Sequence, residues 1–187
     1  MRSLFSILFL ALIFSCTESL NEDNLIYENE INFTSVKQVT FGGDNAEAYW
    51  SFDDKNLVFQ SNYNKWGVEC DQMFLMDVDD TFENDIPKMI STGNGRTTCS
   101  YFMPDNKHIL YASTHLDSSE CPETPLRKNG RYVWPVYDSY DIFVSDLNGN
   151  VVAQLTNEEG YDAEATISPK GDKIVFTSNR SGDLELY

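Results

Sequence analysis

Three stretches of the chain repeat one pattern of apolar and polar positions. They are Trp50 to Ser61, Phe102 to Ser113 and Ile167 to Ser178, and they align without a gap. Each begins with an apolar residue, continues through a turn rich in Asp, Asn, Pro or Gly, and has three consecutive apolar or aromatic residues before it ends in serine. This order predicts a strand, a tight turn and a returning strand. Because the returning runs are apolar on consecutive positions, we expect both faces of each sheet to be covered.

The segments on either side of these units repeat as well. A short apolar strand is predicted before each unit, at residues 36–40, 86–90 and 151–156, and another after each unit, at residues 72–80, 141–149 and 183–187. Four strands per repeat give blades at about 36–80, 81–150 and 151–187, of which the third is truncated. Serial four-stranded antiparallel units favour an all-β β-propeller over a sandwich.

The repeat resembles the WD-like repeat of the TolB propeller family, whose signature is "SPDG", then "IVFTSNRSG", then a strand that ends in "MD". The matching residues are Ser168–Gly171, with Lys170 in place of Asp, Ile174–Gly182, and Met76 with Asp77. The resemblance covers residues 36–187 and implies a propeller of usually six blades. About three blades are present, so we expect this chain to be the N-terminal part of a longer protein.

The N-terminus predicts export. Arg2 is followed by an uncharged, mostly apolar run at residues 3–15, which is too short to span a bilayer and is typical of a secretory signal peptide at residues 1–15. The sequence "IFSC" resembles a bacterial lipobox in which Cys16 is lipidated, with an ordinary cleaved signal peptide as the alternative. Residues 16–35 are predicted to be an acidic tether. We therefore expect a lipoprotein of the periplasm or cell surface, anchored to the outer membrane.

Composition narrows the class of partner. The 187 residues contain 13 Lys and Arg against 30 Asp and Glu, which gives a formal net charge of -17. Such a surface repels nucleic acid and anionic lipid, so we expect contact with a membrane only through the lipid anchor. The expected partner is a protein or small ligand at the rim or channel of the propeller.

Three cysteines besides Cys16 suggest a disulfide, because an exported protein meets oxidising conditions. Cys70, Cys99 and Cys121 are expected near one rim, and the sequence leaves Cys99 with Cys121, or Cys70 with Cys99, as equal alternatives. No CxxC motif or close His pair favours zinc, and the acidic run at residues 77–85 lacks the EF-hand spacing. We expect no metal and no cofactor.

Two sets of residues are candidates for binding. Glu47 and Glu164 occupy equivalent places on the predicted innermost strands, with Thr98 between them in blade order. They could hold a cation or a ligand amine, or bond backbone groups of a neighbouring blade. The second set contains Arg96 and four residues of the long insertion between Ser113 and Tyr140, which is either a recognition loop or a loop packed against its own blade. These four residues are His115, Arg131, Trp134 and Tyr137.

No catalytic motif is visible in the sequence. It contains neither G-x-S-x-G nor H-E-x-x-H, and its two histidines lie in no recognisable catalytic motif. We therefore expect a non-catalytic exported propeller lipoprotein that acts as a binding module at the cell envelope. The alternative is the N-terminal propeller of an exported peptidase, of the prolyl oligopeptidase type or another, whose catalytic domain lies beyond residue 187.

Overall fold

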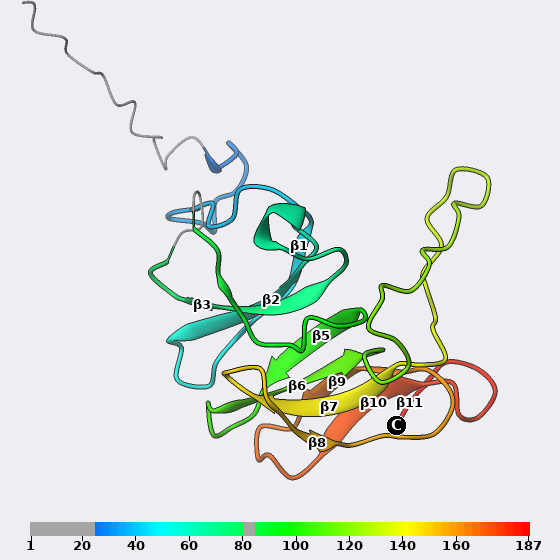
Figure 1. Ribbon diagram of the computed structural model, residues 1–187. Helices are drawn as coiled ribbons and strands as arrows, with labels where there is room; N and C mark the ends of the chain where they lie inside the picture. Colours follow the sequence, from blue (N-terminus) through cyan, green and yellow to red (C-terminus); the bar gives the residue numbers. More distant parts are fainter. Residues whose placement is uncertain (1–24, 81–84) are drawn as a thin grey trace, which may run out of the picture. The chain divides into compact units, whose positions relative to one another are not determined.

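The computed structural model describes residues 25–80 and 85–187 (Figure 1). The chain divides into two compact units, Met1–Gln38 and Val39–Tyr187. The predicted signal peptide, Cys16 and residues 81–84 lie outside the described residues. Within the described part of the chain, no helix is long and apolar enough to cross a membrane.

The described part of the first unit consists of turns. The backbone N–H of Tyr27 donates to the carboxylate of Glu30 at 2.8 Å, and the N–H of Glu30 donates to the carbonyl of Tyr27 at 2.9 Å. This reciprocal pair closes a local turn within the segment for which the sequence predicts an acidic tether.

The described residues of the second unit form three separate antiparallel sheets, in which strand order follows chain order. Separate antiparallel sheets, rather than one continuous sheet, confirm the all-β class and are the arrangement that a propeller requires. The first sheet contains β1 (Asn45–Trp50), β2 (Asn56–Ser61), β3 (Gln72–Asp77) and β4 (Lys88–Met89). The second contains β5 (Thr97–Phe102), β6 (His108–Ser113), β7 (Asp141–Asp146) and β8 (Val151–Gln154). The third contains β9 (Asp162–Ile167), β10 (Ile174–Ser178) and β11 (Glu185–Leu186).

The sheet boundaries differ from the predicted blade boundaries. The sequence assigned β4 and β8 to the repeat that follows each of them, but β4 pairs with β3 and β8 pairs with β7. The predicted strand at residues 36–40 has no strand in the structure, apart from a β-bridge at Thr40. A short turn joins β7 to β8, so β8 pairs with the strand directly before it and completes the second sheet.

Apolar side chains pack the second sheet between the first and the third. Consecutive apolar positions of the returning strand β6 serve both layers, with Ile109 and Tyr111 in one and Leu110 in the other, as the pattern predicts. The layer between the first and second sheets contains Val58, Met73, Ile90, Phe102, Ile109, Tyr111 and Phe143. The layer between the second and third sheets contains Leu110, Ile142, Val144, Ala165 and Ile167.

The other face of the first sheet is covered by its own β2–β3 connection. This connection contains the short 3-10 helix η2 (Asn64–Trp66), and the ring of Trp66 packs edge-on against Phe59 at 6.2 Å and Phe74 at 5.2 Å between centroids. The connection thus gives the first sheet a second apolar layer.

The first hairpin turns of the three sheets share one backbone conformation and pack in series. Asp54, Asn106 and Gly171 occupy equivalent positions with positive φ values of 58°, 55° and 72°. The amide oxygen of Asn106 accepts the backbone N–H of Phe52 at 2.7 Å, which links the first turn to the second. A Cβ at Gly171 would lie 3.0 Å from Cγ of Pro104, so the third turn packs tightly on the second.

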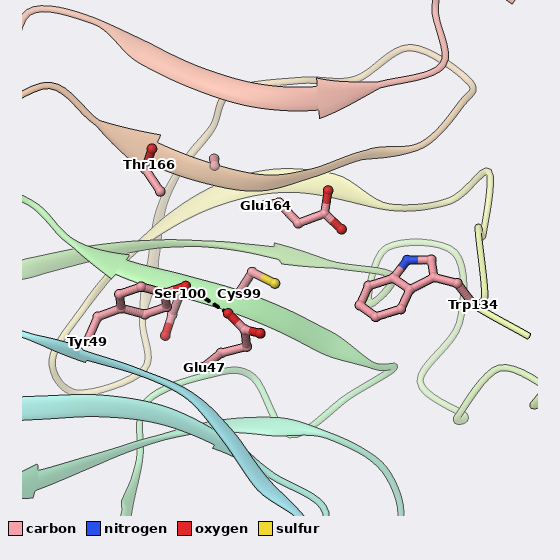
Figure 2. A pocket seen from close by; sticks show the side chains of 8 residues that line it. Glu47, Tyr49, Cys99, Ser100, Trp134, Glu164 and Thr166 are labelled. Atoms are coloured by element: carbon pink, nitrogen blue, oxygen red, sulfur yellow. Dashed lines mark hydrogen bonds between the residues drawn. The ribbon is translucent and has the colours of Figure 1, made fainter. Parts of the chain in front are cut away.

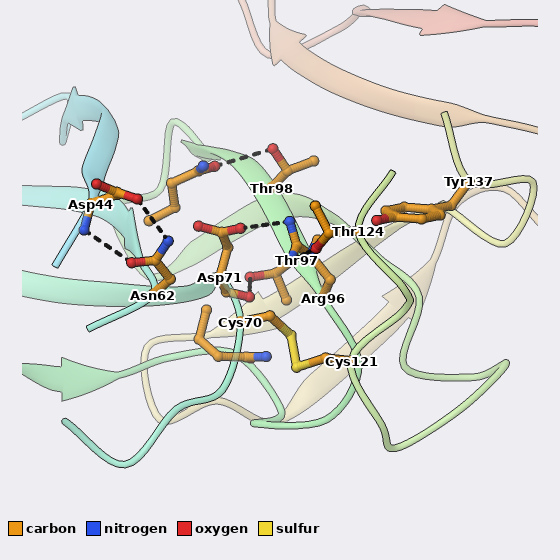
Figure 3. Close-up of polar contacts among 12 residues, drawn as sticks. Asp44, Asn62, Cys70, Asp71, Arg96, Thr97, Thr98, Cys121, Thr124 and Tyr137 are labelled. Atoms are coloured by element: carbon orange, nitrogen blue, oxygen red, sulfur yellow. Dashed lines mark hydrogen bonds and ion pairs between the residues drawn. A yellow bond between two sulfur atoms is a disulfide. The ribbon is translucent and has the colours of Figure 1, made fainter. Parts of the chain in front are cut away.

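A disulfide joins the first two sheets on the loop side. Cys70 in the β2–β3 loop is bonded to Cys121 in the β6–β7 loop with a Cα–Cα distance of 6.0 Å (Figure 3). Cys99 is a buried free thiol. Both pairings expected from the sequence included Cys99 and are wrong. The two bonded cysteines come from equivalent loops of adjacent sheets, whereas Cys99 lies inside β5. The ion pair of Arg96 with Asp71, at 3.2 Å, lies beside the disulfide.

We predict that replacing Cys70 and Cys121 by Ala lowers the free energy of unfolding by about 2–4 kcal/mol, because the cross-link spans 51 residues of the unfolded chain. Urea denaturation followed by circular dichroism measures the change. A reductant should lower the stability of the unaltered chain and leave that of the double variant unchanged. Equal effects of the reductant on both chains would contradict the prediction.

Candidate functional site

The innermost strand of each sheet carries the same β-bulge. In β1, β5 and β9, the pairing register with the neighbouring strand is interrupted at the third residue of the strand. The three residues at this position are Glu47, Cys99 and Glu164, with φ values of 50°, 48° and 53°. A positive φ costs a non-glycine residue about 1–2 kcal/mol, and a bulge redirects its side chain. The sequence placed Thr98 at the equivalent position of the second repeat, and the structure places Cys99 there.

The three bulge residues line one pocket of about 280 Å³ (Figure 2). β5 lies between β1 and β9, so the pocket is built from three innermost strands and one distant loop. The view in Figure 2 shows the sulfur of Cys99 between the carboxylates of Glu47 and Glu164. The remaining lining residues are Tyr49, Ser100, Trp134, Ala165 and Thr166.

Each pocket carboxylate accepts a hydrogen bond from a nearby tyrosine. Glu47 accepts the hydroxyl of Tyr49 at 2.7 Å, and Glu164 accepts the hydroxyl of Tyr161. The hydrogen bond to Glu47 is the main cause that raises the pKa of Tyr49 to about 12. For Tyr161, burial raises the pKa first and the bond to Glu164 adds to it. These contacts show both carboxylates bonded to hydroxyls rather than to the backbone of a neighbouring sheet.

Cys99 is the third member of the bulge series. Burial raises the pKa of its thiol to about 12, the hydrogen bond with Thr98 opposes this rise, and the charges of Glu47 and Glu164 add to it. The thiol therefore stays protonated at neutral pH, and the pocket carries its charge on the two carboxylates.

Trp134 comes to the pocket from the long β6–β7 loop. Its indole N–H donates to the hydroxyl of Tyr161 at 3.5 Å, and that hydroxyl in turn donates to Glu164. This chain of contacts ties the loop to the third sheet and fixes the indole at the edge of the pocket.

The other candidates from the sequence lie elsewhere. The ring of His115 packs on Phe143 at 4.3 Å between centroids, and burial lowers the pKa of this histidine. The hydroxyl of Tyr137 donates to a backbone carbonyl in its own loop, and Arg131 lies near the tip of that loop. Arg96 lines a different pocket, next to Cys70. Three of the seven binding candidates therefore meet at one site, namely Glu47, Glu164 and Trp134.

Comparison with known proteins agrees with the observed sheets. No family model matches the chain, but a solved structure assigned as TolB from Agrobacterium tumefaciens superposes with a TM-score of 0.55 over 82% of this chain, at 18% identity. The fold is that of a TolB-like β-propeller. A second structure, TolB from Acinetobacter baumannii, has a TM-score of 0.49 over 78% of this chain, at 20% identity. The TolB-like chain described here spans 46% and 29% of the lengths of these two proteins.

Sequence reasoning missed four residues of the TolB-like propeller as parts of the site, namely Tyr49, Cys99, Ser100 and Tyr161. Tyr49 and Tyr161 hold the two carboxylates, and Ser100 follows the bulge residue of β5. A strict alignment of the innermost strands would have found Cys99 and Ser100. The tyrosines give no such signal, because Tyr49 lies within its strand and Tyr161 lies just before β9.

We predict opposite effects of Gly and Val at two adjacent positions of β1. The free energy of unfolding of the Glu47→Gly variant should exceed that of Glu47→Val by about 1 kcal/mol. Both variants lose the hydrogen bond to Tyr49, but only valine is strained by the positive φ at this position. At Ala48, which has no positive φ, Val should be more stable than Gly. Thermal and urea unfolding of the four variants measure this, and the same order at both positions would contradict the prediction.

We also predict that Cys99 reacts slowly with a disulfide reagent such as DTNB. In a Cys16→Ser chain at pH 8, a rise in pKa from 9.0 to about 12 lowers the thiolate fraction roughly a thousandfold relative to the unfolded chain. Glu47→Gln should speed labelling, while Glu185→Gln on β11 should not. A native rate within about tenfold of the unfolded rate would refute this.

Proposed function

We propose that this TolB-like propeller is a non-catalytic module of the cell envelope that binds a partner protein through the bulge pocket and the long loop between β6 and β7. The observation that carries the proposal is the position of Trp134. A residue from the longest loop lines a pocket made by the innermost strands of three sheets, so loop and pocket form one continuous surface. Loops held on a rigid scaffold commonly carry binding residues.

The chemistry of the loop suits a protein partner. Figure 1 shows its middle part, in yellow-green, extending away from the sheets. The side chains there are exposed, and they combine apolar, aromatic and cationic groups of the kind enriched in the centres of protein interfaces. They are Leu126, Arg127, Lys128, Arg131 and Tyr132.

Export is part of the proposal and is supported by the disulfide. Cys70 and Cys121 form a cross-link that persists in oxidising compartments and is rare in the cytosol. Together with the apolar run at residues 3–15, this supports a signal peptide, a lipidated Cys16 and an anchor in the outer membrane.

The histidine contacts support a module that does no chemistry. Nδ1 of His115 lies 2.9 Å from Oγ of Ser113, as in a nucleophile and its base, but this serine is only 1% exposed and the imidazole ring packs on Phe143. His108 pairs with Asp105 in an exposed turn. Within residues 25–80 and 85–187, neither histidine contacts both a serine and a carboxylate.

Site-specific photo-crosslinking in the native host tests the proposal. With a benzophenone amino acid at Tyr132, we expect one defined protein adduct, because this residue lies on the extended part of the loop. The control position is Lys170, in the β9–β10 turn.

The adduct should form at residue 132, be absent at residue 170, and disappear when Trp134→Ala is added, because Trp134 anchors the loop at the pocket. Absence of an adduct at residue 132, or the same adducts at both positions, would overturn the proposed function.

A further inference from the structure

We propose that the bulge pocket binds a primary ammonium group of the partner, supplied by a lysine side chain or by a free amino terminus. This inference deepens the proposed function and depends on it. Four features of the pocket support it. Its two carboxylates form no ion pair, its lining contains no cationic side chain, one buried hydroxyl has no hydrogen-bond partner, and an aromatic side chain forms one wall.

The two carboxylates have no cationic partner of their own. Each accepts a tyrosine hydroxyl, and the ion pairs among the described residues involve neither Glu47 nor Glu164. The lining contains no Lys or Arg, so the pocket presents negative charge within a protein whose net charge is already -17. Such a site attracts a cation and repels an anion. The effect of both carboxylates on the thiol of Cys99 shows that their charges act on the same small space.

An unsatisfied hydroxyl lies in the same pocket. Ser100 is 1% exposed, and its Oγ has no hydrogen-bond partner among the described residues. The equivalent residues of the first and third sheets are Ala48 and Ala165, so the repeat itself does not require a polar group there. A buried hydroxyl without a partner is unfavourable, and a ligand N–H donated to it removes that cost.

The geometry suits an ammonium group better than a metal ion. An ammonium has three N–H donors, and the pocket offers three acceptor groups, the carboxylates of Glu47 and Glu164 and the hydroxyl of Ser100. Calcium requires six to eight oxygen ligands, and no cluster of three or more His, Cys, Asp or Glu side chains suited to a metal occurs among the described residues.

Trp134 provides the aromatic wall. Its indole N–H contacts the hydroxyl of Tyr161 at 3.5 Å, and its ring lies at the edge of the pocket with 54% of the residue exposed. An aromatic face attracts a cation and packs against the methylene groups that carry it.

NMR titration of the full chain with small amines tests the inference. The probe is Nα-acetyl-lysine methylamide, with the norleucine analogue as its uncharged control. Alanyl-leucine amide and its acetylated form test a free amino terminus. We expect saturable shifts of the Trp134 indole and the Ser100 amide with one or both amines, and none with the neutral analogues.

Matched variants identify the acceptors. Glu47→Gln and Glu164→Gln should weaken binding of the amine about tenfold or more, since hydrogen bonds to charged groups are the strong ones, while Glu185→Gln, with the same change of charge, should not. Ser100→Ala should weaken binding and yet raise the stability of the free chain, a combination that a purely structural serine would not give.

Three results would overturn the inference: equal shifts with the lysine and norleucine probes, equal binding of the trimethyllysine analogue, which has no N–H to donate, or no saturable shift with either amine. If the crosslink at residue 132 persists in that case, only the ammonium site is wrong. If the crosslink is also absent, the proposed function fails with it.

Discussion

Sheets with apolar side chains on both faces are stable only when both faces are covered, and the first and second sheets of this protein satisfy that constraint in different ways. The returning strands are apolar on consecutive positions, so a sheet covered on one face only would expose half of its apolar side chains. The second sheet meets the requirement between two neighbours, through Phe102 and Ile109 on one side and Leu110 and Ile142 on the other. The first sheet recruits Trp66 from its own loop for the second layer.

Stacking of the sheets brings their innermost strands together, and this proximity creates the site. At each of these strands the chain keeps a residue other than glycine in the left-handed region, where it is strained. The strain recurs at the third residue of each innermost strand. These residues are Glu47, Cys99 and Glu164, and all three side chains line one pocket. Strained backbone is held in place by its surroundings, and each bulge residue has such a contact: Glu47 accepts the hydroxyl of Tyr49, the N–H of Cys99 donates to Gln60, and Glu164 accepts the hydroxyl of Tyr161.

The disulfide and the long loop extend the site outward. Cys70 and Cys121 join equivalent loops of adjacent sheets, so the base of the long loop is fixed to the first sheet. Farther along the same loop, Trp134 is held by Tyr161 on the third sheet. The loop therefore has contacts with the sheets at two places, and the side chains of its middle part are exposed.

The sequence by itself determined the repeating strands, the turns between them and the all-β class, because these depend on local patterns of apolar residues and on turn residues such as Gly171. It also identified Glu47, Glu164 and Trp134 as candidates. The tertiary structure decided the rest. Pairing across strands placed β4 and β8 in the preceding sheets, and contact between loops selected Cys70 with Cys121. Alignment of the innermost strands puts Cys99 in the place of Glu47 and Glu164, but only the three-dimensional register shows that the three bulges turn these side chains into one pocket.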